Sequence, residues 1–584
     1  MDDLRAEARL WGVEDGYFDV FGRWHEPSEE TRRVLVGALS GERACPASPP
    51  PIGEPIQAFQ GDGRRYWLLA VQLYALRSRR NWGHGDFGDL ARLIPLAAAR
   101  GAAGIGLNPL HMLFPDRARE ASPYAPNSRH FLNPLYIDIN AVPEFAGLRH
   151  DRIALAASQA GDLIDYDAVA RSKLSALRTA FAQFASSPIA ARRAEFEKFQ
   201  REQGCALRNF ASFEVLRARF GPVPWTEWPK PWSRPSPDEL TQFRAAEESE
   251  CEFNEYVQWI ADQQLNECKK KAVRCGMPIG LYLDVAVGIH PHGADAWNKQ
   301  EGILSDVSIG APPDEFNPAG QNWGLAPFNP CALSIDNSAP LRELLKSVMR
   351  HAGAIRLDHV LGLKRVFMIP KGYSAADGAY VRFPFEQSLH AIAQESQAAR
   401  CIVIGEDLGT VPEGFREMLA RWGLWSYRVM LFERDDTGCF RAPATYPAEA
   451  LATFNTHDLP SLRAWLDAHD LRTRRSLGLV AGEKADARAR AHQCLRWSLN
   501  EHAPAFTADD LAAVASFLAQ TPSRLVSIAL DDILGVVDQV NIPGTVDEHP
   551  NWRRKVPIDL EELNGDEGFR RVADLFAQSG RSAH

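Results

Sequence analysis

Eight short apolar runs are spread along the chain, and each is followed by a loop and then by a stretch with helical periodicity. The runs lie at 66–76, 103–107, 279–286, 354–358, 401–406, 427–432, 451–455 and 525–530. Near-continuous apolar runs between helices are typical of parallel strands that are buried on both faces, whereas the strands of an antiparallel sandwich alternate apolar and polar residues. The pattern predicts an α/β protein, and eight is the number of strands in a (β/α)8 TIM barrel.

An open, doubly wound sheet is the alternative that gives a similar pattern. A nucleotide-binding sheet of that kind carries a glycine-rich phosphate motif directly after its first strand. No G-x-G-x-x-G or P-loop motif follows the first apolar run. The sequence therefore favours the barrel.

The spacing of the runs predicts how the chain is organised. Residues 1–55 are expected to form a short N-terminal helical segment and a proline-rich linker, because Ser28 precedes two glutamates as a helix cap would and 46–55 contain five prolines. Residues 56–584 are expected to form the barrel. About 170 residues separate the second and third runs, which predicts an inserted, mainly helical subdomain at about 145–270. A loop rich in Gly and Pro is expected at about 305–335.

Composition and charge exclude several classes of protein. The 45% of hydrophobic and 24% of charged residues are typical of a globular protein. The 65 basic and 75 acidic residues give a net charge of −10, which argues against nucleic acid and anionic membranes as partners. Neither a basic, apolar leader nor a run of 18 apolar residues is present, so we predict no signal peptide and no membrane span.

The cysteines bear on compartment and cofactors. The nine cysteines are odd in number and scattered, and no two form a C-x-x-C pair, so the sequence indicates neither a disulfide framework nor a zinc site. Reduced thiols in a cytoplasm fit this usage best. We expect no metal and no cofactor, and the sequence leaves the oligomeric state open.

Three of the predicted strands end in carboxylates. In a β/α barrel the catalytic groups come from the carboxyl ends of several strands. Asp358, Glu406 and Asp458 each follow an apolar run and are spaced 48 and 52 residues apart. This spacing fits strands four, five and seven of a barrel.

The first of these carboxylates has an arginine two residues before it. Arg356 and Asp358 lie on the same face of a strand, where they can meet. A neighbouring guanidinium keeps a carboxylate ionised, as a nucleophile requires. A structural ion pair at the end of the sheet is the alternative.

The second run ends in two adjacent carboxylates, which face opposite ways. We expect Glu406 to point into the pocket because its side chain is longer, while Asp407 would cap the start of the following helix. A carboxyl group among apolar strand residues holds its proton at neutral pH, as a general acid must. Gly405 would leave room for a ligand close to the backbone.

The third run brings His457 next to Asp458. This pair could suggest a triad or a metal site, but no serine lies in a nucleophile elbow, and His290-Pro291-His292 lacks a third ligand. One ionised carboxylate, one protonated carboxyl group and a third that orients the substrate are what glycosidic bond cleavage with retention requires. Asp458, with His457 and Arg356, would hold sugar hydroxyls.

Seven ordered segments resemble one known family. They are NWGHGDFGDL (81–90), SPYAPNSRHFLNPLYIDI (122–139), GAPPDEFNPAGQNWGLAPFNP (310–330), AIRLDHVLGLKRVFMIP (354–370), VIGEDLGTVP (403–412), FNTHDLP (454–460) and NIPGTVDEHPNWRRK (541–555). Together they are similar to the 4-α-glucanotransferases, also called amylomaltases or disproportionating enzymes, glycoside hydrolase family 77 in the α-amylase clan. The resemblance covers nearly the whole chain after the linker.

The resemblance implies a role for each matching residue. Asp358 would be the nucleophile, Glu406 the acid and base, and Asp458 the stabiliser of the transition state. The residues that it implies in substrate binding are Arg356, His457, Tyr124, Ser122, Asn322 and Trp323. The segment 280–297 departs from the better-known members, and Asp284 is a candidate binding residue within it. The implied enzyme needs no metal or cofactor.

The activity that the resemblance implies is transfer of α-1,4-glucan segments from a donor malto-oligosaccharide to glucose or another glucan, with retention. A maltodextrin hydrolase of the same clan is the nearer alternative, because the carboxylates do not distinguish transfer from hydrolysis. A non-catalytic glucan-binding or regulatory protein is the other alternative. The presence of all three carboxylates argues against it.

Overall fold

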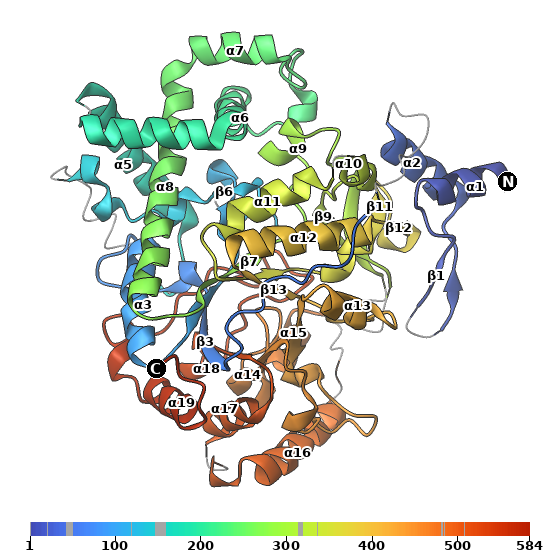
Figure 1. Ribbon diagram of the computed structural model, residues 1–584, viewed down its shortest axis with the longest axis vertical. Coiled ribbons are helices and arrows are strands. Elements are labelled where there is room, and N and C mark those ends of the chain that lie inside the picture. The colour runs from blue at the N-terminus through green and yellow to red at the C-terminus, as the bar shows by residue number, and fades with distance from the viewer. Residues whose placement is uncertain are drawn as a thin grey trace.

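The structure of the chain is a computed structural model. It describes residues 2–19, 22–41, 51–117, 119–146, 159–187, 189–313, 319–335, 337–479, 483, 485–506 and 509–584. Its centre is a closed barrel of eight parallel strands that follow one another in chain order. They are β3 (Tyr66–Val71), β4 (Gly104–Leu107), β7 (Gly280–Val285), β10 (Ala354–Leu357), β13 (Ile402–Gly405), β14 (Trp425–Val429), β15 (Ala450–Thr453) and β16 (Leu525–Ala529), of which β3, β7 and β13 are labelled near the middle of Figure 1. The predicted (β/α)8 fold is confirmed, and each strand falls on one of the eight apolar runs.

The burial of the strands explains their sequence. Every residue of β4, β7, β10, β13 and β15 is buried. One face of each strand lies against the barrel interior and the other lies under the outer helices, so neither face needs polar residues. The absence of alternation along the runs follows from this double burial.

Helices cover the outside of the barrel. They include α3 (Phe87–Ala99), α8 (Glu248–Arg274), α11 (Ala339–Met349), α12 (Phe385–Ala399), α13 (Phe415–Arg421), α17 (Asp510–Gln520) and α19 (Glu567–Gln578). Shorter or peripheral ones are α9 (Ala294–Asn298), α10 (Pro330–Ile335), α14 (Leu462–Leu466), α15 (His469–Ser476), α16 (Ala485–His502) and α18 (Leu530–Ile533). The last long helix returns to the first barrel strand, where Phe576 of α19 stacks on Trp67 of β3 with ring centroids 5.4 Å apart.

A helical unit lies between the second and third barrel strands. It contains the short strands β5 (His111–Met112) and β6 (Ser128–Leu132) and the helices α5 (Tyr166–Ser186), α6 (Ala190–Phe220) and α7 (Pro237–Ala246), which rise above the barrel with α8 in Figure 1. Phe184, Phe196 and Trp259 form an aromatic core between these helices. Residues 147–158 lie outside the described part, so the bounds of 145–270 stay a prediction.

A four-stranded antiparallel sheet lies beside the barrel in the order β12 (Ala379–Arg382), β11 (Arg365–Pro370), β8 (Val307–Ala311) and β9 (Gln321–Leu325). The N-terminal elements α1 (Asp2–Leu10), β1 (Tyr17–Phe18), β2 (Trp24–His25) and α2 (Glu29–Ser40) lie next to it at the right of Figure 1. Ser28 caps α2 as expected, because its side chain accepts a hydrogen bond from the Thr31 N–H at 3.0 Å. Leu35 and Leu39 of α2 belong to the same buried cluster as Met368 of β11. Because 42–50 lie outside the described residues, the linker and the division at residue 55 stay predictions.

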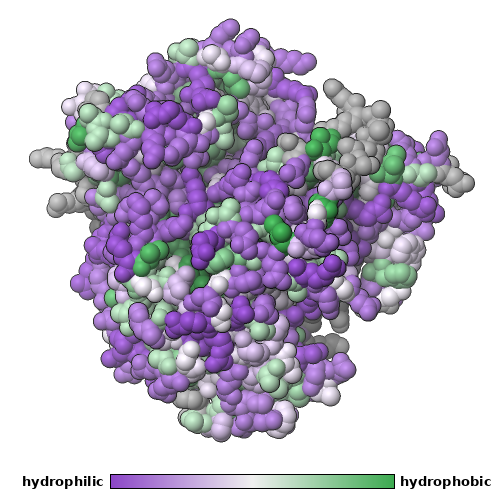
Figure 2. Space-filling view, in the orientation of Figure 1, coloured by the Kyte–Doolittle hydropathy of each residue, from purple (hydrophilic) through white to green (hydrophobic). Residues whose placement is uncertain are grey.

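The face of the molecule in Figure 2 is mostly hydrophilic, with small separate hydrophobic patches. Among the described residues, no helix combines the length and the apolar character that a membrane span requires.

Candidate active site

A cavity of about 660 Å³ opens at the carboxyl ends of the barrel strands. Asp358, Glu406 and Asp458 all line it. They follow β10, β13 and β15, which are the fourth, fifth and seventh strands of the barrel. The structure therefore brings together the three carboxylates that the sequence singled out.

Asp358 is fixed by the arginine two residues before it. Arg356 Nη2 lies 2.8 Å from Asp358 Oδ1, so the expected contact forms inside the site. Burial raises the pKa of Asp358 to about 6; the guanidinium opposes this rise, and the negative charges of Asp284 and Glu406 add to it. At pH 7 the carboxylate form therefore predominates.

Glu406 is held by the backbone. Its Oε2 accepts the His359 N–H at 2.8 Å, and its Oε1 accepts the Leu408 N–H at 3.0 Å. Burial raises the pKa of Glu406 above its ordinary value, against the effect of Arg356 and of the two backbone donors. In the barrel register Leu357 pairs with Gly405, so the residues that follow them, Asp358 and Glu406, are neighbours across two strands.

Two expectations about the residues next to Glu406 were wrong. Asp407 does not cap the following helix: it is fully buried and accepts hydrogen bonds from Arg416 Nε at 2.7 Å and from the Tyr427 N–H at 3.1 Å. Gly405 does not leave room for a ligand, because a Cβ there would lie 2.9 Å from Val360 Cγ1. The glycine allows close packing of the loop after β10.

Asp458 and His457 contact each other in the loop that follows β15. Asp458 Oδ1 accepts a hydrogen bond from Asn541 Nδ2 at 2.6 Å, and its Oδ2 lies 3.3 Å from His457 Nε2. Burial works to raise the pKa of Asp458, but His457 and Asn541 outweigh it and the pKa is lowered. Burial works to lower the pKa of His457, but Asp458 outweighs it and the pKa is raised. The pair favours an ionised Asp458.

Asp284, on β7, holds two side chains of the site in place by hydrogen bonds. Both of its carboxylate oxygens accept hydrogen bonds from Arg356 Nη1 at 2.9 Å, and its Oδ2 also accepts the Tyr124 hydroxyl at 2.5 Å. The Tyr124 ring in turn stacks on His457, with centroids 4.7 Å apart. Asp284 therefore connects the guanidinium next to Asp358 to the histidine next to Asp458.

The other predicted binding residues differ in their placement. Ser122 and Trp323 line the cavity. Asn322 does not: its Oδ1 accepts hydrogen bonds from Ser308 Oγ at 2.8 Å and from the Gly324 N–H at 2.9 Å. Successive residues of a strand face opposite ways, so β9 presents Gln321 and Trp323 to the cavity instead. Part of the predicted loop, 314–318, lies outside the described residues.

Sequence reasoning did not single out several residues of the cavity wall. Trp552, Asn541, Phe432 and Gln321 are among them. Asn541 and Trp552 lie in the quoted segment 541–555 and come from the loop after β16, so that segment could have pointed to them. Phe432 follows β14, and an aromatic side chain there gave no signal comparable to the carboxylates that were sought at strand ends.

No group of three or more His, Cys, Asp and Glu side chains in the described part of the chain is arranged to hold a metal ion. The charges in the site are instead arranged around Arg356, which contacts Asp284 and Asp358 at 2.9 and 2.8 Å.

Comparison with known proteins gives a consistent result. The sequence model of the 4-alpha-glucanotransferase family matches residues 71–560. The chain is 36% identical over 555 residues to the 4-alpha-glucanotransferase of Haemophilus influenzae, a match that covers 88% of this chain and 79% of that protein. It is 37% identical over 555 residues to the 4-alpha-glucanotransferase of Mycobacterium tuberculosis, with 89% and 75% covered.

Solved structures show the same likeness. Amylomaltase from Corynebacterium glutamicum superposes with a TM-score of 0.83 and 28% identity, covering 98% of this chain and 99% of that one. The amylomaltase from Streptococcus agalactiae in complex with acarbose has a TM-score of 0.72 at 19% identity, covering 89% and 100%, which is a likeness of fold.

Proposed function

Because the chain belongs to the 4-alpha-glucanotransferase family and is an enzyme with that activity, we propose that Asp358, Glu406 and Asp458 carry out its chemistry. The observation that supports this most is the convergence of the three carboxylates, with different partners, on one cavity. The comparisons do not favour the alternative of a maltodextrin hydrolase.

In the proposed first step, the Asp358 carboxylate attacks the anomeric carbon of the donor glucose. The glycosidic bond breaks, and Glu406 transfers its proton to the leaving oxygen, which becomes the 4-hydroxyl of the released segment. Asp358 and Glu406 follow paired residues on adjacent strands, which run about 4.8 Å apart. This spacing suits the separation of about 5 Å between the carboxyl groups of retaining enzymes.

In the second step, Glu406 acts as the base. It removes the proton from the 4-hydroxyl of the acceptor, whose oxygen attacks the anomeric carbon and releases Asp358. The configuration is inverted twice and is therefore retained. Asp458, kept ionised by His457, would hold hydroxyls of the distorted ring and counter the positive charge that develops on it.

Binding of the substrate is proposed to use the aromatic and polar wall of the cavity. Tyr124, Trp323 and Trp552 offer faces or edges for sugar rings, and Arg356 and His457 offer donors for hydroxyls. We propose malto-oligosaccharides as donors and glucose or a longer glucan as acceptors. The neutral, hydroxyl-rich substrate fits an acidic protein that needs no basic patch.

We also propose the compartment and the metabolism in which the enzyme acts. The eight cysteines that the structure describes are free thiols, which suits a reducing cytoplasm, where maltodextrins and glycogen are handled. A cell fractionation that measures the transferase beside a cytoplasmic marker tests this assignment.

Trapping of the covalent intermediate tests the chemical roles. In Glu406→Gln, α-maltosyl fluoride should still glycosylate the enzyme, because fluoride leaves without a proton, and the product should persist because the base is missing. We expect a maltosyl group on Asp358 by peptide mass mapping, together with intact binding of glucan. A label on a residue other than Asp358 would contradict the assignment. So would transfer from maltotriose by Glu406→Gln at the wild-type rate.

A further inference from the structure

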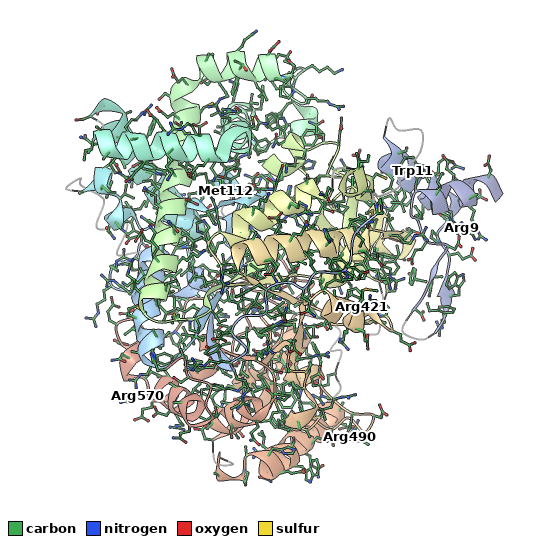
Figure 3. The ribbon with its side chains drawn as sticks, viewed as in Figure 1. Arg9, Trp11, Met112, Arg421, Arg490 and Arg570 are labelled. Carbon is green, nitrogen blue, oxygen red and sulfur yellow. The ribbon has the colours of Figure 1, made fainter. Side chains whose placement is uncertain are left out.

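Two thiols from distant parts of the chain meet outside the catalytic cavity. Cys439 lies in the turn that follows β14, and Cys494 lies on α16, 55 residues further along. Their sulfur atoms are 2.7 Å apart, closer than the van der Waals contact between two sulfurs. Arg490, labelled in Figure 3, marks α16 one helical turn before Cys494.

The turn that carries Cys439 is well defined. An antiparallel bridge joins Arg434 to Phe440, and the Asp435 N–H donates to the Cys439 carbonyl at 2.8 Å. The Asp435 side chain closes the turn by accepting the Cys439 N–H at 3.0 Å. Hydrogen bonds within its own turn therefore hold the backbone of Cys439 in place.

The turn that carries Cys439 and helix α16 both pack on the same side chain, Trp465. Phe440, next to Cys439, packs edge-on against Trp465 with centroids 6.4 Å apart. His492 of α16 lies against the same ring, with centroids 4.6 Å apart, and bonds to the Trp465 carbonyl at 3.1 Å. The contact between the sulfurs thus follows from packing on Trp465 and does not require a chance orientation of two free loops.

We propose that Cys439 and Cys494 form a reversible disulfide, which is a thiol modification site distinct from the active site. Both residues are partly exposed, so a small oxidant can reach them. The neighbouring Cys439 sulfur raises the pKa of the Cys494 thiol, burial adds to this rise, and the Arg434 guanidinium opposes it.

The reaction with oxidised glutathione balances in two steps. One protein thiolate attacks the glutathione disulfide, forms a mixed disulfide and releases one glutathione thiolate. The second protein thiol, after loss of its proton, attacks the protein sulfur of the mixed disulfide and releases the second glutathione. Two protein thiols are oxidised, one glutathione disulfide is reduced, and excess reduced glutathione reverses both steps.

The bond would join a wall of the cavity to a peripheral helix. Phe432, which lines the catalytic cavity, precedes Cys439 by seven residues in the same segment. Cys494 is followed by Leu495, which anchors α16 in the core. Oxidation would therefore crosslink the segment after β14 to α16 without involving any of the proposed catalytic residues.

The test is a redox titration of the full chain with reduced and oxidised glutathione, read by peptide mass mapping without reduction. We expect a crosslink between the peptides of Cys439 and Cys494 that reverses with excess reduced glutathione. The effective concentration of the Cys439 thiol at the Cys494 thiol should fall at least about 100-fold when the same titration is run in urea. The reason is that the fold brings the two sulfurs together, although they lie far apart in the sequence.

Variants make the test specific. Cys439→Ser and Cys494→Ser should each abolish the crosslink while transferase activity shows that the chain is folded. Cys205→Ser removes an exposed thiol on α6 and should leave the crosslink intact. The proposal is overturned if the folded wild type carries only single glutathione adducts at these positions, or if the crosslink is equally favoured in urea.

Discussion

Asp358 and Glu406 are neighbouring acidic side chains in one cavity, and their hydrogen-bond partners differ. Arg356 contacts Asp358 at 2.8 Å, which favours the charge that a nucleophile needs. Burial raises the pKa of both carboxyl groups, but Glu406 has no side-chain cation within hydrogen-bonding distance among the described contacts. The two carboxyl groups therefore differ in their direct partners, which suits the proposed assignment of Asp358 as nucleophile and of Glu406 as acid.

The pH dependence of kcat/KM should report these two groups. Because Asp358 must be ionised and its pKa is about 6, activity should fall about tenfold per unit as the pH drops below 6. Because Glu406 must be protonated and its pKa is raised, the alkaline limb should lie above the ordinary range of a glutamate. Initial rates with maltotriose across the pH range measure both limbs. An acid limb near pH 4 would contradict the raised pKa of Asp358.

At the scale of elements, the register of neighbouring strands places the charged groups. Arg356 of β10 pairs with Asp284 of β7 on one side and with Ile404 of β13 on the other. The guanidinium is therefore held by a strand that contributes none of the three proposed catalytic carboxylates. The alternation of side chains along β9 explains why Gln321 and Trp323 line the cavity while Asn322 does not.

The variant Asp284→Asn tests the interaction between Asp284 and Arg356. Loss of the negative charge removes one cause of the raised pKa of Asp358, so the acid limb of kcat/KM should move to lower pH. We also expect kcat to fall about 10- to 100-fold, because Arg356 loses the charged partner that accepts hydrogen bonds from its Nη1. Tyr124→Phe removes a hydrogen bond to Asp284 without changing its charge and serves as the control. An unmoved acid limb in Asp284→Asn would argue against the electrostatic coupling.

The packing of α2 on the small sheet gives a second prediction at this scale. Leu39 is fully buried in the cluster that includes Met368 and Val381. Leu39→Ala should cost about 2–4 kcal/mol of stability by leaving a cavity. Leu10→Ala, at a leucine that is 61% exposed on α1, is the matched control and should change stability by less than about 0.5 kcal/mol. Calorimetry of both variants measures the difference, and equal shifts would show that α2 does not stabilise the sheet.

At the scale of the whole molecule, the chain is a single barrel with additions around it. The eight barrel strands could be predicted because burial on both faces leaves continuous apolar runs. The strand ends could then be searched for carboxylates, which located Asp358, Glu406 and Asp458 without reference to contacts.

The remaining features depend on contacts that sequence patterns do not encode. The sheet of β8, β9, β11 and β12 consists of short segments whose pairing joins residues far apart in the chain. The role of Gly405 depends on the position of Val360, and that of Asp407 on Arg416. Trp552 reaches the cavity from a loop after the last barrel strand. In each case the missing information was the neighbour in space.

The products formed from maltotriose by the wild type and by Asp358→Asn test the account most directly. A glucanotransferase moves a segment without adding water, so the wild type should give glucose and longer oligosaccharides while the number of reducing ends stays constant. Asp358→Asn should form these products at least about 10³-fold more slowly, because it lacks the nucleophile. Glucose and maltose alone with rising reducing ends, or an Asp358→Asn variant as active as the wild type, would contradict the account.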